Sequence, residues 1–352
     1  MQKEIIGYKR TTEISEILHQ IHVNSVLFFH GQQSFENHRL LFEQLLSDYS
    51  TIHYSNIKPN PKYEQIQDAI DKFKGTKFDA IIAFGGGSVI DFAKAFRFYS
   101  NIKTPLFAIP TTAGTGSEAT QFAVVYINGI KNSLDDPTIL PDYAILDSQF
   151  TEKAPQYIKA CSAIDAYCQA MESYWSVRST KESLKYAKQA IMLINDSIEK
   201  FVLLSDMNAA EKMMLASHLS GMAINISRTT AAHALSYTIT TQYGIPHGHA
   251  VALSMPDLVH ANFNVSESNC RDSRGVSFVR AKLNDILYMI GIKTPDEFTE
   301  YWHKLMDKLG MEWRIDKLGI RNTQNIINGV NKARLANNPV DIMDTIKTFY
   351  QR

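Results

Sequence analysis

Short apolar runs alternate with amphipathic segments along the first 150 residues of the chain. Four runs rich in β-branched and aromatic residues have the length of buried strands, and three stretches with helical periodicity lie between them. The predicted strands are 26–29, 52–54, 80–84 and 106–109, and the predicted helices are 35–48, 62–73 and 89–99. This order of elements predicts an α/β domain whose parallel sheet is covered by helices on both faces.

The pattern changes near residues 147–155, beyond which helical periodicity dominates. The predicted helices there span 152–178, 180–203, 208–225, 229–242, 250–262, 276–290, 295–309 and 323–350. The sequence therefore predicts two domains, an α/β domain over residues 1–150 and an all-α domain over residues 151–352.

Composition narrows the class of protein. The 352 residues are 45% hydrophobic, and 36 basic residues balance 36 acidic ones, so the chain lacks the positive field typical of proteins that bind nucleic acid or anionic membranes. Three scattered cysteines (Cys161, Cys168 and Cys270) give no disulfide framework or CxxC pair. The N-terminus lacks the apolar core of a signal peptide, and no stretch reaches about 18 apolar residues. We expect a cytoplasmic globular protein with a small-molecule partner.

A run of glycines follows the predicted strand 80–84 and opens a helix. Glycines let backbone N–H groups approach a ligand closely, and the start of a helix favours an anion. The segment contains Gly85, Gly86, Gly87, Ser88 and Asp91. An ordinary strand-to-helix turn would have the same composition, and the spacing differs from the GxGxxG fingerprint. The segment nevertheless fits the pyrophosphate of a dinucleotide.

A second polar loop follows the predicted strand 106–109. It contains Thr111, Thr112, Thr115 and Ser117, so two hydroxyl- and glycine-rich loops leave the sheet at one edge. Together they are suited to enclose a dinucleotide, although each alone is more often a capped turn. Gly31 follows the first predicted strand, at the place where an acidic residue would bind the adenosine ribose. Without that carboxylate, a 2′-phosphate is not repelled, and we expect NADPH to be accepted.

The helical half contains a candidate set of metal ligands. Asp165 and Gln169 lie four residues apart on one helix face, and His233 and His247 follow fourteen residues apart. A carboxylate and two imidazoles suit a catalytic divalent ion, with the Gln169 amide as a weak fourth ligand. His249 is a competing ligand. Each residue also has a structural explanation, as a solvated carboxylate or a core histidine.

Five segments together identify the chain as similar to the iron-containing, or group III, alcohol dehydrogenases. They are GGGSVIDFAK at 85–94, PTTAGTGSE at 110–118, DPTILPDYAILD at 136–147, SAIDAYCQAMESYWS at 162–176, and His233 with PHG at 246–248. The resemblance implies an N-terminal α/β dinucleotide-binding domain and a C-terminal helical domain. It also implies two cofactors, NAD(P)H and one divalent ion (iron or zinc), which lie together between the domains. The resemblance further implies a homo-oligomer, namely a dimer.

The resemblance also assigns residues. The family's metal-binding aspartate falls on Asp165 and its two later histidines on His233 and His247, whereas its first histidine is replaced by Gln169. Another histidine common in the family is replaced by Tyr237, whose hydroxyl is a candidate proton donor. Both departures leave open a homologue that binds a nucleotide but has lost its activity.

The resemblance also suggests a substrate, through one branch of the family. The segments around Arg228, Arg271 and Arg274 resemble the phosphonoacetaldehyde reductase branch of the family. A guanidinium recognises a phosphonate well, although each arginine could equally form an ordinary surface ion pair. The implied reaction interconverts phosphonoacetaldehyde and 2-hydroxyethylphosphonate. The alternative is an oxidoreductase of another small aldehyde, diol or sugar alcohol.

Overall fold

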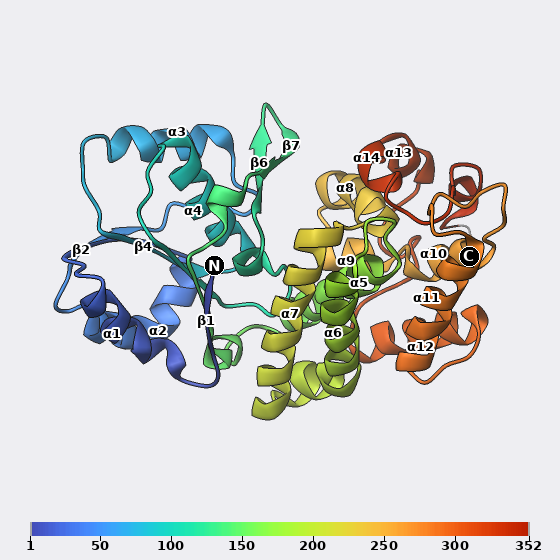
Figure 1. The fold of residues 1–352 in the computed structure, drawn as a ribbon, viewed down its shortest axis with the longest axis horizontal. Helices are drawn as coiled ribbons and strands as arrows, with labels where there is room; N and C mark the ends of the chain where they lie inside the picture. Colours follow the sequence, from blue (N-terminus) through green and yellow to red (C-terminus); the bar gives the residue numbers. More distant parts are fainter. Residues whose placement is uncertain (1, 351–352) are drawn as a thin grey trace. The chain divides into compact units, whose positions relative to one another are not determined.

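A computed structural model describes residues 2–350, and the chain divides into two compact units at Ala154 and Pro155. The N-terminal unit is drawn in blue to green in Figure 1. It contains a six-stranded parallel sheet with strand order β1-β8-β5-β4-β2-β3. Its strands are β1 (Lys3–Ile6), β2 (Ser25–His30), β3 (Ser50–Tyr54), β4 (Ala80–Gly85), β5 (Leu106–Pro110) and β8 (Tyr143–Leu146).

Helices cover both faces of this sheet, as the apolar runs predict. Successive side chains of a strand point to opposite faces, so Val26 and Phe28 enter one core while Leu27 and Phe29 enter the other. The first core also contains residues of α1 (Glu13–Gln20) and α2 (Gln32–Leu45), and the second contains residues of α3 (Tyr63–Lys72) and α4 (Gly87–Tyr99).

The strand order reverses between β2 and β4. The chain passes from β2 outward to β3 and then returns to place β4 on the other side of β2. In open α/β sheets, ligands bind outside the carboxyl ends of the strands at such a point. Gly31 and Gly85 occupy these two strand ends, and the Gly31 N–H donates to the carbonyl of Phe84 at 3.0 Å.

The four predicted strands are present, but other strands were missed. β1 and β8 have only four residues each and give weak patterns, while β6 (Phe122–Ile127) and β7 (Ile130–Asp135) form a separate antiparallel hairpin. Asn128 and Gly129 at its turn have φ of 52° and 75°. An Asn-Gly pair between apolar runs is a strong hairpin signal that the sequence interpretation overlooked.

The C-terminal unit is helical, and the predicted α/β plus all-α fold class is confirmed. Its α-helices are α5 (Gln156–Trp175), α6 (Lys181–Glu199), α7 (Met207–Ser227), α8 (Ala231–Tyr243), α9 (His247–Ala252), α10 (Met255–Phe263), α11 (Val276–Met289), α12 (Pro295–Lys308), α13 (Thr323–Asn328) and α14 (Lys332–Leu335). The short turns are the 3-10 helices η1 (Arg10–Thr12), η2 (Ser117–Ala119), η3 (Pro137–Ile139), η4 (Ser148–Thr151) and η6 (Thr345–Thr348), and the π-helix η5 (Lys200–Leu204).

Two predicted helices are interrupted. The segment 250–262 is divided between α9, which ends at Ala252, and α10, which begins at Met255. The segment 323–350 is broken into α13, α14 and η6, and Pro339 follows two asparagines between the last two. Proline has no N–H to donate and disfavours helical geometry in the residue before it, so a continuous helix cannot pass this point.

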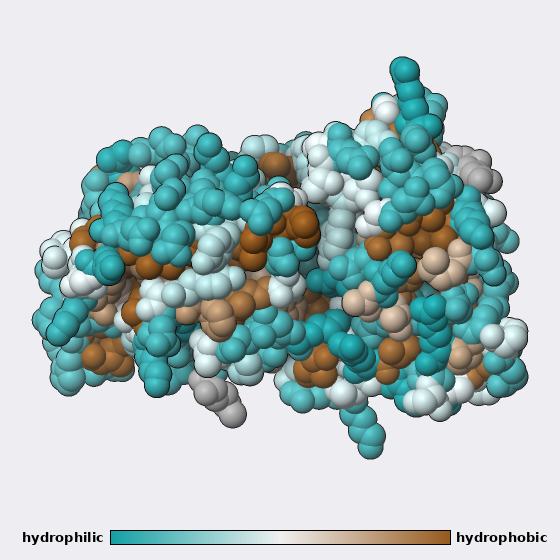
Figure 2. All heavy atoms as spheres, turned by 90° about the horizontal axis from the view of Figure 1, so that it is seen from above, coloured by the Kyte–Doolittle hydropathy of each residue, from teal (hydrophilic) through white to brown (hydrophobic). Residues whose placement is uncertain are grey.

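Polar side chains cover most of the face drawn in Figure 2, and apolar side chains gather there only in small separate patches. Within residues 2–350, the most exposed large apolar side chains lie far apart in the sequence; they are Leu40, Ile130, Leu204 and Tyr288. Within the same range, no helix combines the length and apolar character needed to cross a membrane.

Candidate functional site

Three side chains from three helices meet in the C-terminal unit. Asp165 lies on α5, His233 on α8 and His247 at the first position of α9, and their ligand atoms all lie within 4.8 Å of one another. Nε2 of His233 lies 3.3 Å from Oδ1 of Asp165. Asp165 and His233 are buried, whereas His247 is half-buried. The structure therefore brings together the three strongest predicted ligands.

Glu172 holds the His233 ring from behind. Nδ1 of His233 donates to Oε2 of Glu172, while the other oxygen of Glu172 accepts from Thr230 Oγ1 at 2.8 Å and from the Ala232 N–H at 2.8 Å. Burial opposes ionisation of Glu172, but His233 and these donors keep the pKa of its carboxyl below the usual value. This arrangement directs Nε2 of His233 toward Asp165 and fixes the ring, as carboxylates do for metal-binding histidines.

Sequence reasoning missed Glu172, although a signal was present. Glu172 lies seven residues after Asp165 and three after Gln169, so all three share one face of α5. The sequence gives this shared face but does not show that His233 packs against it.

Gly248 brings α9 against α5. A Cβ at this position would lie 1.9 Å from the carbonyl oxygen of Cys161 and 2.8 Å from Cβ of Asp165, so only glycine allows this approach. His247 is the preceding residue, and its Nδ1 lies 3.4 Å from Oγ of Ser236. Close helix packing thus places the second histidine beside Asp165.

Gln169 occupies the predicted fourth position with its amide already engaged. Its Oε1 accepts a hydrogen bond from Ser220 Oγ on α7 at 3.0 Å, and both side chains are buried. His249, the competing ligand, instead makes contacts with Tyr157 Oη at 2.8 Å and the Glu312 carbonyl at 2.7 Å. The cluster therefore consists of one carboxylate and two imidazoles.

Both buried thiols, Cys161 and Cys168, lie on α5 with Asp165. Burial raises the pKa of Cys161 to about 11 and also raises that of Cys168. Both thiols stay protonated at neutral pH, which suits packing rather than nucleophilic chemistry.

Tyr237 lies beside the cluster on α8. Its ring stacks on the His247 ring with centroids 6.5 Å apart, and it is half-buried. Burial raises the pKa of Tyr237, and Arg334 opposes that shift. The tyrosine hydroxyl is therefore protonated at neutral pH.

The three predicted anion-binding arginines have intramolecular partners. Arg228 ends α7 with φ of 63°, and its guanidinium donates to the Asn225 carbonyl at 2.9 Å. Arg271 pairs with Asp341 at 2.8 Å, and Arg274 pairs with Asp272 at 2.7 Å. Arg274 also donates to backbone carbonyls of Ser176, Val177 and Ser179.

The two predicted nucleotide loops lie side by side in the N-terminal unit. A Cβ on Gly87 would lie 2.7 Å from Thr115 Oγ1, and one on Gly86 would lie 3.7 Å from Thr112 Oγ1. The Thr111 N–H also donates to the Gly85 carbonyl at 3.1 Å. The glycines thus keep a narrow space between the hydroxyl-rich loop and the start of α4, where free N–H groups attract an anion.

Asp91 and Lys94, both on α4, hold the hydroxyl-rich loop in place through hydrogen bonds. Asp91 accepts hydrogen bonds from Ser117 Oγ and from the Val124 N–H. Nζ of Lys94, which is fully buried, donates to Ser117 O, Ser117 Oγ, Thr120 Oγ1 and Phe122 O at 2.7–3.2 Å. Asp91 and Ser117 therefore face each other, and Lys94 was not identified from the sequence.

The remaining predicted residues surround the same strand ends. Thr111 Oγ1 lies 3.4 Å from Ser34 Oγ, and Ser88 Oγ accepts from the Asn60 N–H at 3.3 Å. Gly31 precedes α2, and a Cβ there would meet Ser34 Oγ at an ordinary 3.4 Å. Gly31 is therefore not required by packing.

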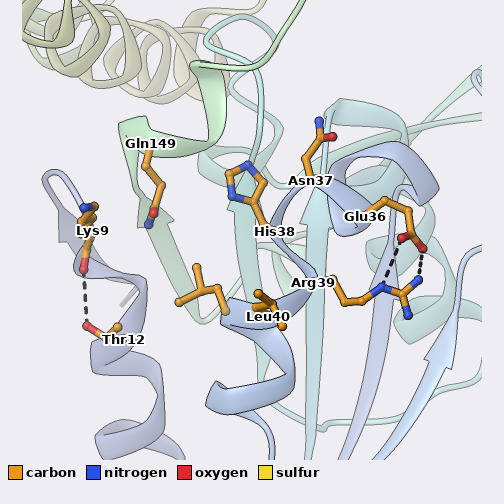
Figure 3. A pocket seen from close by; sticks show the side chains of 9 residues that line it. Lys9, Thr12, Glu36, Asn37, His38, Arg39, Leu40 and Gln149 are labelled. Carbon is orange, nitrogen blue, oxygen red and sulfur yellow. Dashed lines mark hydrogen bonds and ion pairs between the residues drawn. The ribbon is translucent and has the colours of Figure 1, made fainter.

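A separate hollow of about 520 Å³ is lined by the segment around η1, by α2 and by Gln149 of η4, and does not include any of the predicted site residues. Figure 3 shows its lining, in which Arg39 pairs with Glu36 and Thr12 donates to the Lys9 carbonyl. The lining residues are Lys9, Thr12, Glu36, Asn37, His38, Arg39, Leu40, Leu41 and Gln149. Arg39 is thus already paired with a carboxylate, and none of the glycines of the predicted nucleotide loop reaches this hollow.

Comparison with known proteins gives two family matches that together span most of the chain. Residues 2–148 match the model described as iron-containing alcohol dehydrogenase. Residues 159–351 match the C-terminal model of the Fe-containing alcohol dehydrogenase family.

Three similar proteins illustrate the range of relatives. A phosphonoacetaldehyde reductase of Streptomyces viridochromogenes is 32% identical over 247 residues, which cover 62% of each chain. A 1-propanol dehydrogenase of Salmonella typhimurium is 33% identical over 244 residues, 66% of each chain. The solved sulfoacetaldehyde reductase of Bifidobacterium kashiwanohense, in complex with NAD+, has a TM-score of 0.88 at 24% identity and covers 99% of this chain and 96% of its own. This last likeness supports the fold alone.

Proposed function

Since the chain belongs to the iron-containing alcohol dehydrogenase family, we propose that it is a metal-dependent NAD(P)H oxidoreductase of small aldehydes and primary alcohols. The cluster of Asp165, His233 and His247 carries this proposal, because one carboxylate and two imidazoles with ligand atoms within 4.8 Å of one another form a set that suits a catalytic divalent ion. The two departures from the family pattern, at Gln169 and Tyr237, leave that cluster intact.

The three side chains fit a divalent ion. Nδ1 of His233 donates to Glu172, so its buried Nε2, which lies 3.3 Å from Oδ1 of Asp165, is the ring nitrogen that would face a bound ion. Neutral imidazoles and one carboxylate suit iron or zinc and leave positions for other ligands. When bound, the ion supplies a Lewis acid and NAD(P)H supplies a hydride.

The nucleotide belongs at the glycine loop. Gly85 to Ser88 and Thr111 to Ser117 present N–H groups and hydroxyls that suit the pyrophosphate, with Asp91 holding Ser117 in place. Gly31 offers no carboxylate at the strand end that meets the adenosine ribose, so a 2′-phosphate is tolerated.

Residues of this chain also handle the proton. Reduction of an aldehyde leaves an oxygen that needs one proton, and the Tyr237 hydroxyl is a protonated group whose ring stacks on His247. Because water can also deliver this proton, Tyr237→Phe should slow turnover without abolishing it.

Phosphonoacetaldehyde is the finer proposal for the substrate. It is supported by the match to a phosphonoacetaldehyde reductase, whose 32% identity extends over only part of either chain. The second candidate is another small aldehyde or alcohol, which is supported by the equally similar 1-propanol dehydrogenase.

The test is the oxidation of NADH and NADPH with a panel of aldehydes, measured after chelation and again after addition of iron or zinc. We expect activity that chelation removes and one ion restores. His233→Ala and His247→Ala should each lose stoichiometric metal, as measured by elemental analysis, whereas Gln169→Ala should lose less. Activity that survives complete removal of metal would contradict the proposal, and binding of nucleotide with no activity on any aldehyde would favour a lapsed enzyme.

A further inference from the structure

Arg334 lies near the metal cluster on a helix that sequence analysis did not connect with the site. It belongs to α14, and its guanidinium carbon lies 5.8 Å from the centroid of the Tyr237 ring. That ring stacks on His247, one of the three cluster residues. Two ring contacts therefore separate the guanidinium from the His247 imidazole.

The partners of Arg334 are neutral. Its guanidinium donates to the Thr229 hydroxyl and interacts with Tyr237, and within residues 2–350 it has no carboxylate at ion-pair distance. Arg271 and Arg274, in contrast, each pair with an aspartate. A half-buried guanidinium whose charge is not neutralised favours an anion nearby, and its planar donors match the oxygens of a phosphonate or sulfonate.

Burial indicates which side of the cluster is open. Asp165 and His233 are buried, while His247, Tyr237 and Arg334 are all half-buried. The more accessible residues of this group are thus the ones that ring contacts connect to Arg334.

Arg334 is also held in place. Its backbone N–H donates to Oδ1 of Asn331 at 3.0 Å, and Asn337 donates to the carbonyls of Ser227 and Thr229 at 2.9 and 3.0 Å. These bonds connect the α14 region to the segment that precedes α8. An anion at Arg334 therefore meets a charge whose position is largely fixed before binding.

We propose that Arg334 selects the substrate by binding an anionic head group, so that the enzyme prefers small aldehydes bearing a phosphonate or sulfonate over neutral ones. This inference rests on the proposed aldehyde reduction and names the substrate class for the same site. It assigns the anion to Arg334 instead of Arg228, Arg271 or Arg274.

The test compares Arg334→Met with Lys332→Met, which removes one positive charge from an exposed position of the same helix. We expect kcat/KM for phosphonoacetaldehyde to fall about ten- to a hundredfold in Arg334→Met, the effect of losing a hydrogen bond to a charged group. Activity on propionaldehyde should change less than threefold, and Lys332→Met should change neither. Arg334→Lys keeps the charge but not the planar donors, so it should lose less and checks that the effect is not misfolding.

Equilibrium binding gives a second readout. Calorimetry with 2-hydroxyethylphosphonate and with 2-hydroxyethanesulfonate should show weaker binding of the preferred anion to Arg334→Met, and the comparison of the two in wild type identifies the head group. Equal losses for charged and neutral aldehydes would overturn the assignment to Arg334, as would a selective loss in Arg228→Met with none in Arg334→Met. Wild type that favours propionaldehyde would overturn the substrate class while leaving the proposed reduction standing. Absence of activity on every aldehyde would instead refute the proposed function.

Discussion

The metal cluster and the nucleotide loops are built in opposite ways. The cluster uses charged and imidazole side chains from three helices, each fixed by buried neighbours such as Glu172. The loops use backbone groups and hydroxyls, and they depend on glycines for clearance. The cluster should therefore fail when a supporting contact is lost or the helices are pushed apart, whereas the loops should fail when a side chain fills their space.

Gly248→Ala should have the largest effect. The new Cβ would lie 1.9 Å from the Cys161 carbonyl oxygen, so α9 must move away from α5 and carry His247 with it. We expect loss of stoichiometric metal and a lower free energy of unfolding, by at least about 1–3 kcal/mol, the usual cost of overpacking. Elemental analysis and urea unfolding measure the two effects.

Gly86→Ala is the matched control for this prediction, because its Cβ would have no atom closer than 3.7 Å. It should keep both the metal and wild-type stability. A Gly248→Ala protein that binds one ion with wild-type stability would show that α9 does not approach α5 as closely as described.

Glu172→Gln should weaken the cluster without removing a ligand. The amide keeps the size of the side chain but removes the charge that orients His233, so metal affinity should fall about ten- to a hundredfold. Competition with a chelator measures this change. Nucleotide affinity, followed by NADH fluorescence, should stay within about twofold, and an equal loss of both affinities would mean that Glu172 acts through general destabilisation.

Gly86→Val addresses the loops in the same way. The branched side chain would extend from a Cβ that already lies 3.7 Å from Thr112 Oγ1, into the space proposed for the pyrophosphate. We expect nucleotide binding about tenfold weaker, which corresponds to about 1.4 kcal/mol, with metal content unchanged. Unaltered NADH and NADPH affinity would place the phosphates elsewhere.

Local sequence patterns were enough to predict much of the fold and part of the candidate site. The apolar runs at 26–29 and 80–84 gave buried strands because both faces of the sheet are covered, and helical spacing placed Asp165 and Gln169 on one face of α5. Contacts between helices have no such periodic signal. The support of His233 by Glu172 depends on how α8 packs on α5, which spacing along the chain does not encode.

Because the sequence does not show contacts between helices, the roles of some residues were predicted too simply or missed. Arg271 and Arg274 were nominated for an anion on sequence context, but their partners Asp341 and Asp272 are fixed by tertiary structure. Lys94 looked like an ordinary helical lysine, and only the fold places four oxygen atoms around its amine.

The pH dependence of Lys94 is the sharpest check on the loop, and its effect within any single pH unit should be the smallest of those predicted. Burial lowers the pKa of Lys94 from 10.5 to about 8, with Asp91 and Glu118 acting in the opposite direction and Arg97 in the same direction as burial. Between these two values the unfolded chain binds more protons than the folded protein, so raising the pH through this window favours folding. Below about pH 8 the folded protein carries the full cost of the buried charge.

The free energy of unfolding of wild type minus that of Lys94→Met should therefore increase between pH 8 and pH 10, by on the order of 1 kcal/mol per pH unit. Urea unfolding of both proteins across this range measures the difference, and Lys74→Met, at an exposed lysine of the same unit, is the control variant. Metal content of Lys94→Met should equal that of wild type, because its contacts lie in the nucleotide loop and not in the cluster. A difference that does not vary with pH would mean that the folded and unfolded states bind the proton of this amine equally well, which would contradict the lowered pKa of Lys94.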